Sequence, residues 1–156
     1  MHQQLRGIMA ETPQDQFVSC IPLPAMASSI ATARMHTRLL MNKWHLLSVV
    51  DDAELVVSEI VTNAIKATNI IPPQARYPDL YDRMEVVCLC FYRHATELVI
   101  EVWDPKREPP QRRDVTLDDE GGRGLFLVEA LSKRWGTRWP PTGGKFVWAL
   151  LSLDIA

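Results

Sequence analysis

The sequence predicts an α/β protein, a two-layer sandwich in which helices cover one face of a mixed, mostly antiparallel sheet. The predicted elements run strand, helix, helix, strand, strand, helix, strand, strand, an order that does not alternate as parallel βαβ units do. Apolar residues recur at helical spacing in the long segments and alternate in the short ones. With 156 residues, 47% of them hydrophobic, the chain is long enough for one compact domain and too short for two ordinary ones.

A polar arm precedes the first strand. Residues 1–15 lack periodicity, which leaves residues 16–156 as the predicted domain. Phe17–Ile21 is rich in residues that favour strands. We expect this strand to close at Pro22 and Pro24, because proline cannot donate a ladder hydrogen bond.

Two long helices are predicted next. Ala25–Trp44 consists of good helix formers without glycine or proline, and it predicts the first helix. Asp51 and Asp52 suit the first turn of the second helix, where the helix dipole is positive. The apolar stripe of this helix continues to about Thr68.

A hairpin and a loop follow the helices. Met84–Tyr92 and Glu97–Trp103 are β-rich, and residues 93–96 are the expected turn between them. Residues 105–120 carry prolines and many charges but little apolar content, which predicts a mobile surface loop.

The last part of the chain predicts a helix and two strands. Gly121–Gly124 leads into the helix, which we expect to end before Gly136. Strands over Gly136–Trp139 and Lys145–Leu153, joined by a turn at residues 140–144, close the sheet.

Composition narrows the classes of function. A formal net charge of -2 gives no general attraction for nucleic acid or anionic lipid. No apolar run reaches the length that spans a bilayer, so we expect a soluble, cytoplasmic protein that contacts neither nucleic acid nor membrane. Cys20, Cys88 and Cys90 contain no Cys-x-x-Cys pair, and they predict buried reduced thiols.

Glu59 and Asn63 lie four residues apart, so they project from the same face of the second predicted helix. Hard oxygen ligands of this kind suit Mg²⁺, and a carboxylate beside the metal can deprotonate a hydroxyl nucleophile. An exposed polar helix face is the alternative interpretation of this spacing.

Asp104 follows an alternating apolar run and therefore lies at the end of a predicted strand. A carboxylate at such a position can accept a hydrogen bond from an exocyclic amine such as that of adenine. The alternative is an aspartate that starts the turn into Pro105.

Gly121–Gly124 offers unhindered backbone N–H groups at the start of a helix, where an anion such as phosphate binds favourably. The pattern is not a P-loop, since no Gly-Lys-Ser/Thr follows, and it lacks the spaced glycines of a dinucleotide-binding turn.

In this order and with these gaps, Ser58–Ala64, Val102–Pro105 and Glu120–Gly136 resemble the N, G1 and G2 boxes of the histidine-kinase-type (GHKL, Bergerat-fold) ATPases. Together with Gly144–Trp148, they are most similar to the anti-sigma-factor serine/threonine kinases and their small actinomycete-type relatives. The resemblance covers the chain from about residue 17 to residue 153 and implies the Bergerat ATP-binding fold.

The resemblance implies a site for ATP and Mg²⁺. By it, Glu59 would be the general base, Asn63 the magnesium ligand and Asp104 the acceptor of the adenine amine, while residues 105–120 would form the ATP lid. The residues implied at the phosphates are Gly121, Gly122, Arg123, Gly124 and Leu125.

The chain departs from the family pattern at the residues that would contact adenine. The usual G1 box continues Asp-x-Gly-x-Gly, whereas Asp104 is followed by Pro105–Pro110, which contains no glycine. The threonine that assists the aspartate at adenine in the family falls at Phe146 by the same resemblance. We expect the resemblance to the family to fail first in the half of the site that would bind adenine.

The resemblance favours an ATP-dependent protein serine/threonine kinase that phosphorylates a protein antagonist, sequesters a sigma factor, or does both. The expected partners are a sigma factor or an anti-anti-sigma-type protein, and homodimerisation is left open. The alternative is a degenerate, non-catalytic protein-binding module with weak or no nucleotide binding. A detached histidine-kinase catalytic domain is disfavoured, because His36 is followed by Thr37 rather than by an acidic residue.

Overall fold

The computed structural model describes residues 17–68, 85–110 and 124–154. Residues 1–15 lie outside these ranges, so the division into arm and domain stays a prediction. The described strands form one sheet in the order β1-β2-β3-β5-β4, with antiparallel pairing throughout. These strands are β1 (Phe17–Pro24), β2 (Val86–His94), β3 (Glu97–Asp104), β4 (Arg134–Arg138) and β5 (Lys145–Ser152).

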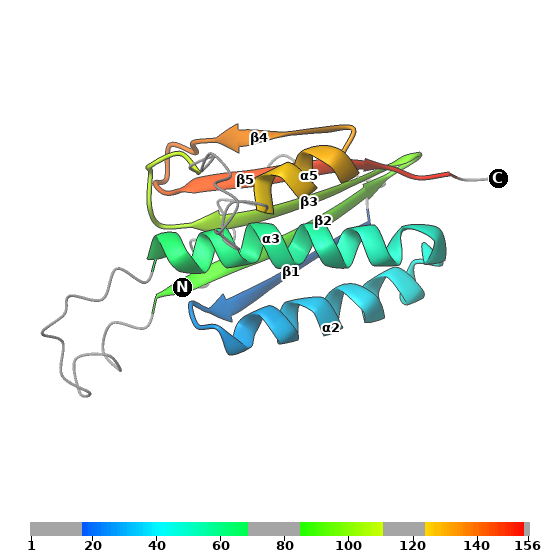
Figure 1. Ribbon diagram of the computed structural model, residues 1–156, viewed down its shortest axis with the longest axis horizontal. Helices are drawn as coiled ribbons and strands as arrows, with labels where there is room; N and C mark the ends of the chain where they lie inside the picture. The colour runs from blue at the N-terminus through cyan, green and yellow to red at the C-terminus, as the bar shows by residue number, and fades with distance from the viewer. Residues whose placement is uncertain (1–16, 69–84, 111–123, 155–156) are drawn as a thin grey trace, which may run out of the picture.

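The α-helices lie on one side of the sheet (Figure 1), as the two-layer prediction requires. They are α2 (Ser28–Lys43), α3 (Val50–Thr68), which follows the short 3-10 helix η1 (Leu47–Val49), and α5 (Gly124–Leu131). Helix α3 is central, because it packs against α2, α5 and β3. Within the described ranges no helix has the length and apolar character needed to cross a membrane.

Strand β1 continues through Pro22 and Pro24, so the expected closure at these residues is wrong. The reason is its position at the edge of the sheet that the described strands form, where its partner is β2. Alternate N–H groups of an edge strand point away from the sheet, and proline is tolerated there. The strand pairing extends to Ala25, whose N–H bonds the Glu85 carbonyl, so α2 begins only at Ser28.

The hairpin turn between β2 and β3 is tighter than predicted. His94 and Glu97 already pair with each other, which leaves only Ala95 and Thr96 in the turn. Ala95 adopts a φ of 46°, the left-handed conformation that such short turns require.

Helix α5 ends at Leu131, before Gly136 as predicted. The Lys133 N–H donates to the Leu150 carbonyl at 2.8 Å, so the chain has already joined β5 at this point. Strand β4 accordingly begins at Arg134, two residues before the predicted start.

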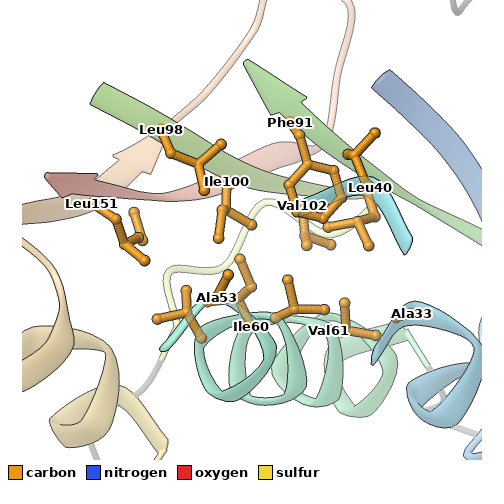
Figure 2. Packing of buried hydrophobic residues seen from close by; sticks show 14 of the residues in the cluster. Ala33, Leu40, Ala53, Ile60, Val61, Phe91, Leu98, Ile100, Val102 and Leu151 are labelled. Carbon is orange, nitrogen blue, oxygen red and sulfur yellow. The ribbon is translucent and has the colours of Figure 1, made fainter. Parts of the chain in front are cut away.

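The core lies between α3 and the sheet. Ile60 and Val61 of α3 face Ile100 and Val102 of β3, with Phe91 of β2 beside them (Figure 2). All five side chains are fully buried. The helical stripe and the strand alternation that the sequence shows therefore meet in one apolar layer.

Cys20 and Cys90 form a disulfide across directly paired positions of β1 and β2, with their Cα atoms 4.1 Å apart. Only Cys88 keeps a free thiol, so the expectation of three reduced thiols is wrong. The pairing could not be predicted, because it depends on the register of two strands separated by the helices. All three sulfurs lie on the sheet face opposite the helices, since Val87, Leu89 and Phe91 occupy the helix-facing positions of β2.

Adjacent residues of β3 allow a test of this layer. Ile100→Ala should lower the free energy of unfolding by about 2–5 kcal/mol, because it leaves a cavity under α3. Val99 is only partly buried and has the opposite parity, so Val99→Ala should cost less. Urea unfolding of both variants measures the difference, and equal losses would contradict the assigned face of β3.

Candidate functional site

Glu59 and Asn63 lie in the middle of α3, one helical turn apart, and both side chains are half-buried. Their flanking hydroxyl groups are bonded within the helix: Ser58 donates to the Glu54 carbonyl and Thr62 to the Ser58 carbonyl. The carboxylate and the carboxamide thus form a polar patch at the margin of the apolar core, as the sequence predicts.

The Glu59 carboxylate lies directly against Gly124, the first residue of α5. A Cβ atom on Gly124 would collide with Oε2 of Glu59 and come within 3.3 Å of its Cδ. A side chain at this position would therefore displace the carboxylate of Glu59 from where it lies. The contact joins the predicted general base to the end of the predicted phosphate loop, two features 65 positions apart in the sequence, as the numbers 59 and 124 show.

The surroundings of Glu59 shift the pKa of its carboxyl. Burial raises the pKa of its carboxyl above the ordinary value, because the charged form loses hydration, while the positive charge of Lys66 partly opposes this shift. A raised pKa is favourable for a group that must both take up and release a proton near neutral pH.

Asp104 ends β3 with its side chain 1% exposed. Its Oδ1 accepts two hydrogen bonds, from the Lys106 N–H at 2.9 Å and from Nζ of Lys145 at 2.9 Å. Its Oδ2 is buried and accepts no hydrogen bond from the part of the chain that is described. A buried acceptor of this kind is costly unless a donor reaches it.

Lys145 is the site residue that the sequence analysis missed. The register of β3 and β5 pairs it directly with Asp104, and its side chain is 3% exposed. Its Nζ also donates to the Lys106 carbonyl at 3.2 Å. The sequence did contain a signal for it, because Lys145 directly follows a glycine turn and starts an apolar strand. A lysine at the start of a buried strand is rarely without a charged partner.

Phe146 does not face Asp104, so the expected correspondence with the threonine of the family is wrong. Side chains alternate along β5, which turns Phe146 to the outer face of the sheet. There the Arg138 guanidinium stacks over its ring at 3.9 Å and also bonds Glu101. The position that faces Asp104 is one residue earlier, at Lys145.

The segment after Asp104 is fastened to the turn between β4 and β5. The Trp139 indole N–H donates to the Arg107 carbonyl at 2.8 Å, and Nζ of Lys145 donates to the Lys106 carbonyl at 3.2 Å. Gly144 makes the approach possible: its φ is 70°, and a Cβ there would collide with the Asp104 carbonyl oxygen. These contacts fix the chain where the family pattern has its two glycines.

The remaining predicted site residues divide into two groups. Gly124 and Leu125 are both buried at the start of α5. Gly121, Gly122 and Arg123, together with the later part of the predicted lid, lie outside the described residues. The described structure therefore brings together Glu59, Asn63 and Gly124, and separately pairs Asp104 with Lys145.

Comparison with known proteins identifies the family. The model of the histidine kinase-like ATPase domain matches residues 23–148, most of the chain. The chain belongs to this family. A search of the curated proteins finds no match.

ATPase domains of this family bind ATP, usually with Mg²⁺. The residues present fit such a ligand at its base end, because the buried Oδ2 of Asp104 is an acceptor without a donor among the described residues. The polar pair of Glu59 and Asn63 offers the oxygen atoms that Mg²⁺ prefers. The described residues thus offer an acceptor where the base is expected and oxygen atoms where the metal ion is expected.

The Glu59–Gly124 contact can be tested by a double-mutant cycle. Gly124→Ala should not stabilise the domain although alanine favours a helix, because the new Cβ displaces the Glu59 carboxylate. In a Glu59→Ala background the collision is gone, and the same substitution should stabilise the fold by up to about 1 kcal/mol. Urea unfolding of the four proteins gives the coupling energy. A coupling energy of zero would show that a Cβ atom at position 124 does not contact the Glu59 carboxylate.

Proposed function

We propose that this ATPase domain is a regulatory protein serine/threonine kinase that phosphorylates a protein antagonist, sequesters a sigma factor, or does both. The observation that carries the proposal is the contact between the Glu59 carboxylate and Gly124. It puts a carboxylate of raised pKa beside the start of a helix, where the backbone favours anions.

Each residue has a defined task in this proposal. Bound Mg-ATP would supply the transferable phosphoryl group. Asn63 would hold the metal ion, Glu59 would take the proton from the attacking serine or threonine hydroxyl, and Asp104 would accept a hydrogen bond from the base amine through Oδ2. By the family resemblance, Leu125 and the residues at positions 121–124 would contribute backbone N–H groups to the phosphates.

The proposed partner is a sigma factor or an anti-anti-sigma-type protein. Support for this comes from the resemblance of the Ser58–Ala64 and Glu120–Gly136 segments to the anti-sigma-factor kinases. The charge balance also agrees with a protein partner, because a net charge of -2 provides no general affinity for nucleic acid.

A second candidate function is a protein-binding module with weak or no nucleotide turnover. The fastened segment after Asp104 favours it, since hydrogen bonds to the carbonyls of Lys106 and Arg107 restrict a region that is glycine-rich in the family pattern. The two candidates differ in whether ATP binds at all.

Thermal unfolding with and without ATP and Mg²⁺ separates the candidates. Binding at a hundred times Kd should stabilise the fold by about 2.7 kcal/mol. Asn63→Ala should remove the magnesium-dependent part of this shift, whereas Asn42→Ala, an exposed asparagine on α2, should keep it. Absence of any shift at millimolar ATP would refute the kinase proposal.

The pH dependence of phosphoryl transfer tests the role of Glu59. Only the ionised carboxylate accepts a proton, so the transfer rate to a partner serine should rise with pH through the raised pKa of Glu59. Glu59→Gln should reduce the rate by about 10²–10⁴-fold and flatten the profile, while ATP still binds. Glu97→Gln, in a partly exposed ion pair, is the matched control. A Glu59→Gln variant that retains the wild-type rate and profile would rule out Glu59 as the base.

A further inference from the structure

Asp104 and Lys145 form a buried ion pair with an unequal distribution of hydrogen bonds. Both donors supplied by the described residues, the Lys106 N–H and Nζ of Lys145, reach Oδ1 at 2.9 Å. Oδ2 is equally buried but receives none of them. The described residues therefore hold the carboxylate by one oxygen, and the other receives no donor from among them.

The position of Lys145 is fixed from several sides. The register of β3 and β5 places it opposite Asp104, and the Lys106 carbonyl accepts a second of its protons. Gly144 brings the preceding turn against the Asp104 backbone, where any other residue would collide. Lys145 consequently keeps its Nζ beside the carboxylate without the freedom of a surface lysine.

The ionisation of Asp104 depends on this arrangement. Burial raises the pKa of its carboxyl, and the negative charge of Glu108 adds to the rise. The hydrogen bond and charge of Lys145 lower this pKa, as does the hydrogen bond from the Lys106 amide. Loss of Lys145 would remove the largest contributions that lower this pKa. A protonated carboxyl carries an O–H donor, which competes with the amine donor of a base.

We propose that Lys145 is a positioning residue for the base site: it holds Asp104 as an ionised acceptor, with Oδ2 directed to the exocyclic amine of adenine. This inference rests on the proposed function, because it assumes that a purine nucleotide binds at Asp104. In this chain an ammonium group performs the supporting role that the threonine hydroxyl has in the resembling family, and it adds a positive charge.

The test compares wild type with Lys145→Met, which keeps the length of the side chain and removes its charge. In the nucleotide-free protein, carbon-13 NMR of the Asp104 carboxyl should show a pKa at least one unit higher in the variant, an estimate based on loss of a close opposite charge. Lys133→Met, which removes the ammonium of an exposed ion pair with Glu97, should leave that pKa unchanged. An unchanged pKa in Lys145→Met overturns the inference.

Calorimetric titration with ADP, without metal, adds a functional measurement. At pH 7 Lys145→Met should bind ADP about 10- to 100-fold more weakly, and its affinity should recover as the pH is raised and Asp104 ionises. A purely structural defect would lower the affinity equally at every pH, and that result overturns the inference. If wild type itself fails to bind ADP at millimolar concentration, the proposed function fails, whereas the NMR result still decides the role of Lys145.

A folding defect in Lys145→Met would itself be informative. Its Asp104 would have a folded-state pKa above the unfolded value, so thermal stability should fall as the pH rises through that interval. The neutral double variant Asp104→Asn/Lys145→Met should fold without this pH dependence. Stability of Lys145→Met that does not change between acid and neutral pH would contradict the charge-compensating role.

Discussion

The apolar stripe of α3 packs between the sheet and its neighbouring helices, and the positions of the proposed catalytic groups depend on this packing. Ile60 and Val61 are fully buried against β3, which leaves Glu59 and Asn63 at the margin of the same helix. Any rotation of α3 that moved these polar groups would also expose the apolar stripe. Exposure costs about 25 cal/mol of folding free energy per Å² of apolar surface. The core therefore fixes the direction in which Glu59 points toward Gly124.

Two carboxyl groups in the site are desolvated, but the chain compensates them differently. Asp104 is almost fully buried beside a lysine, so its charge is balanced within the fold. Glu59 is half-buried, and the charge of Lys66 partly opposes the rise of its pKa. In the proposed function, these two groups of the same chemical type have different tasks, Asp104 as an acceptor held by a lysine and Glu59 as a group that exchanges a proton.

The parts of the fold that depend on local pattern could be predicted from the sequence. The stripe of α3 and the alternation of β3 have one interpretation each, and both elements occur nearly as expected. The Cys20–Cys90 pairing and the position of Lys145 could not be predicted, because they depend on the register between distant strands. The same limit explains the error at Phe146, since a shift of one residue exchanges the two faces of a strand.

The sulfur atoms on the outer face have a further consequence for the edge of the sheet. The disulfide fastens β1 covalently to β2, and Cys88 lies beside it with its Sγ 3.9 Å from that of Cys90. Burial raises the pKa of the Cys88 thiol to about 11, so roughly one molecule in 10⁴ carries the thiolate at neutral pH. Internal thiol–disulfide exchange is therefore suppressed. The edge strand, which also contains two prolines, is protected against peeling away and exchanging with a second chain.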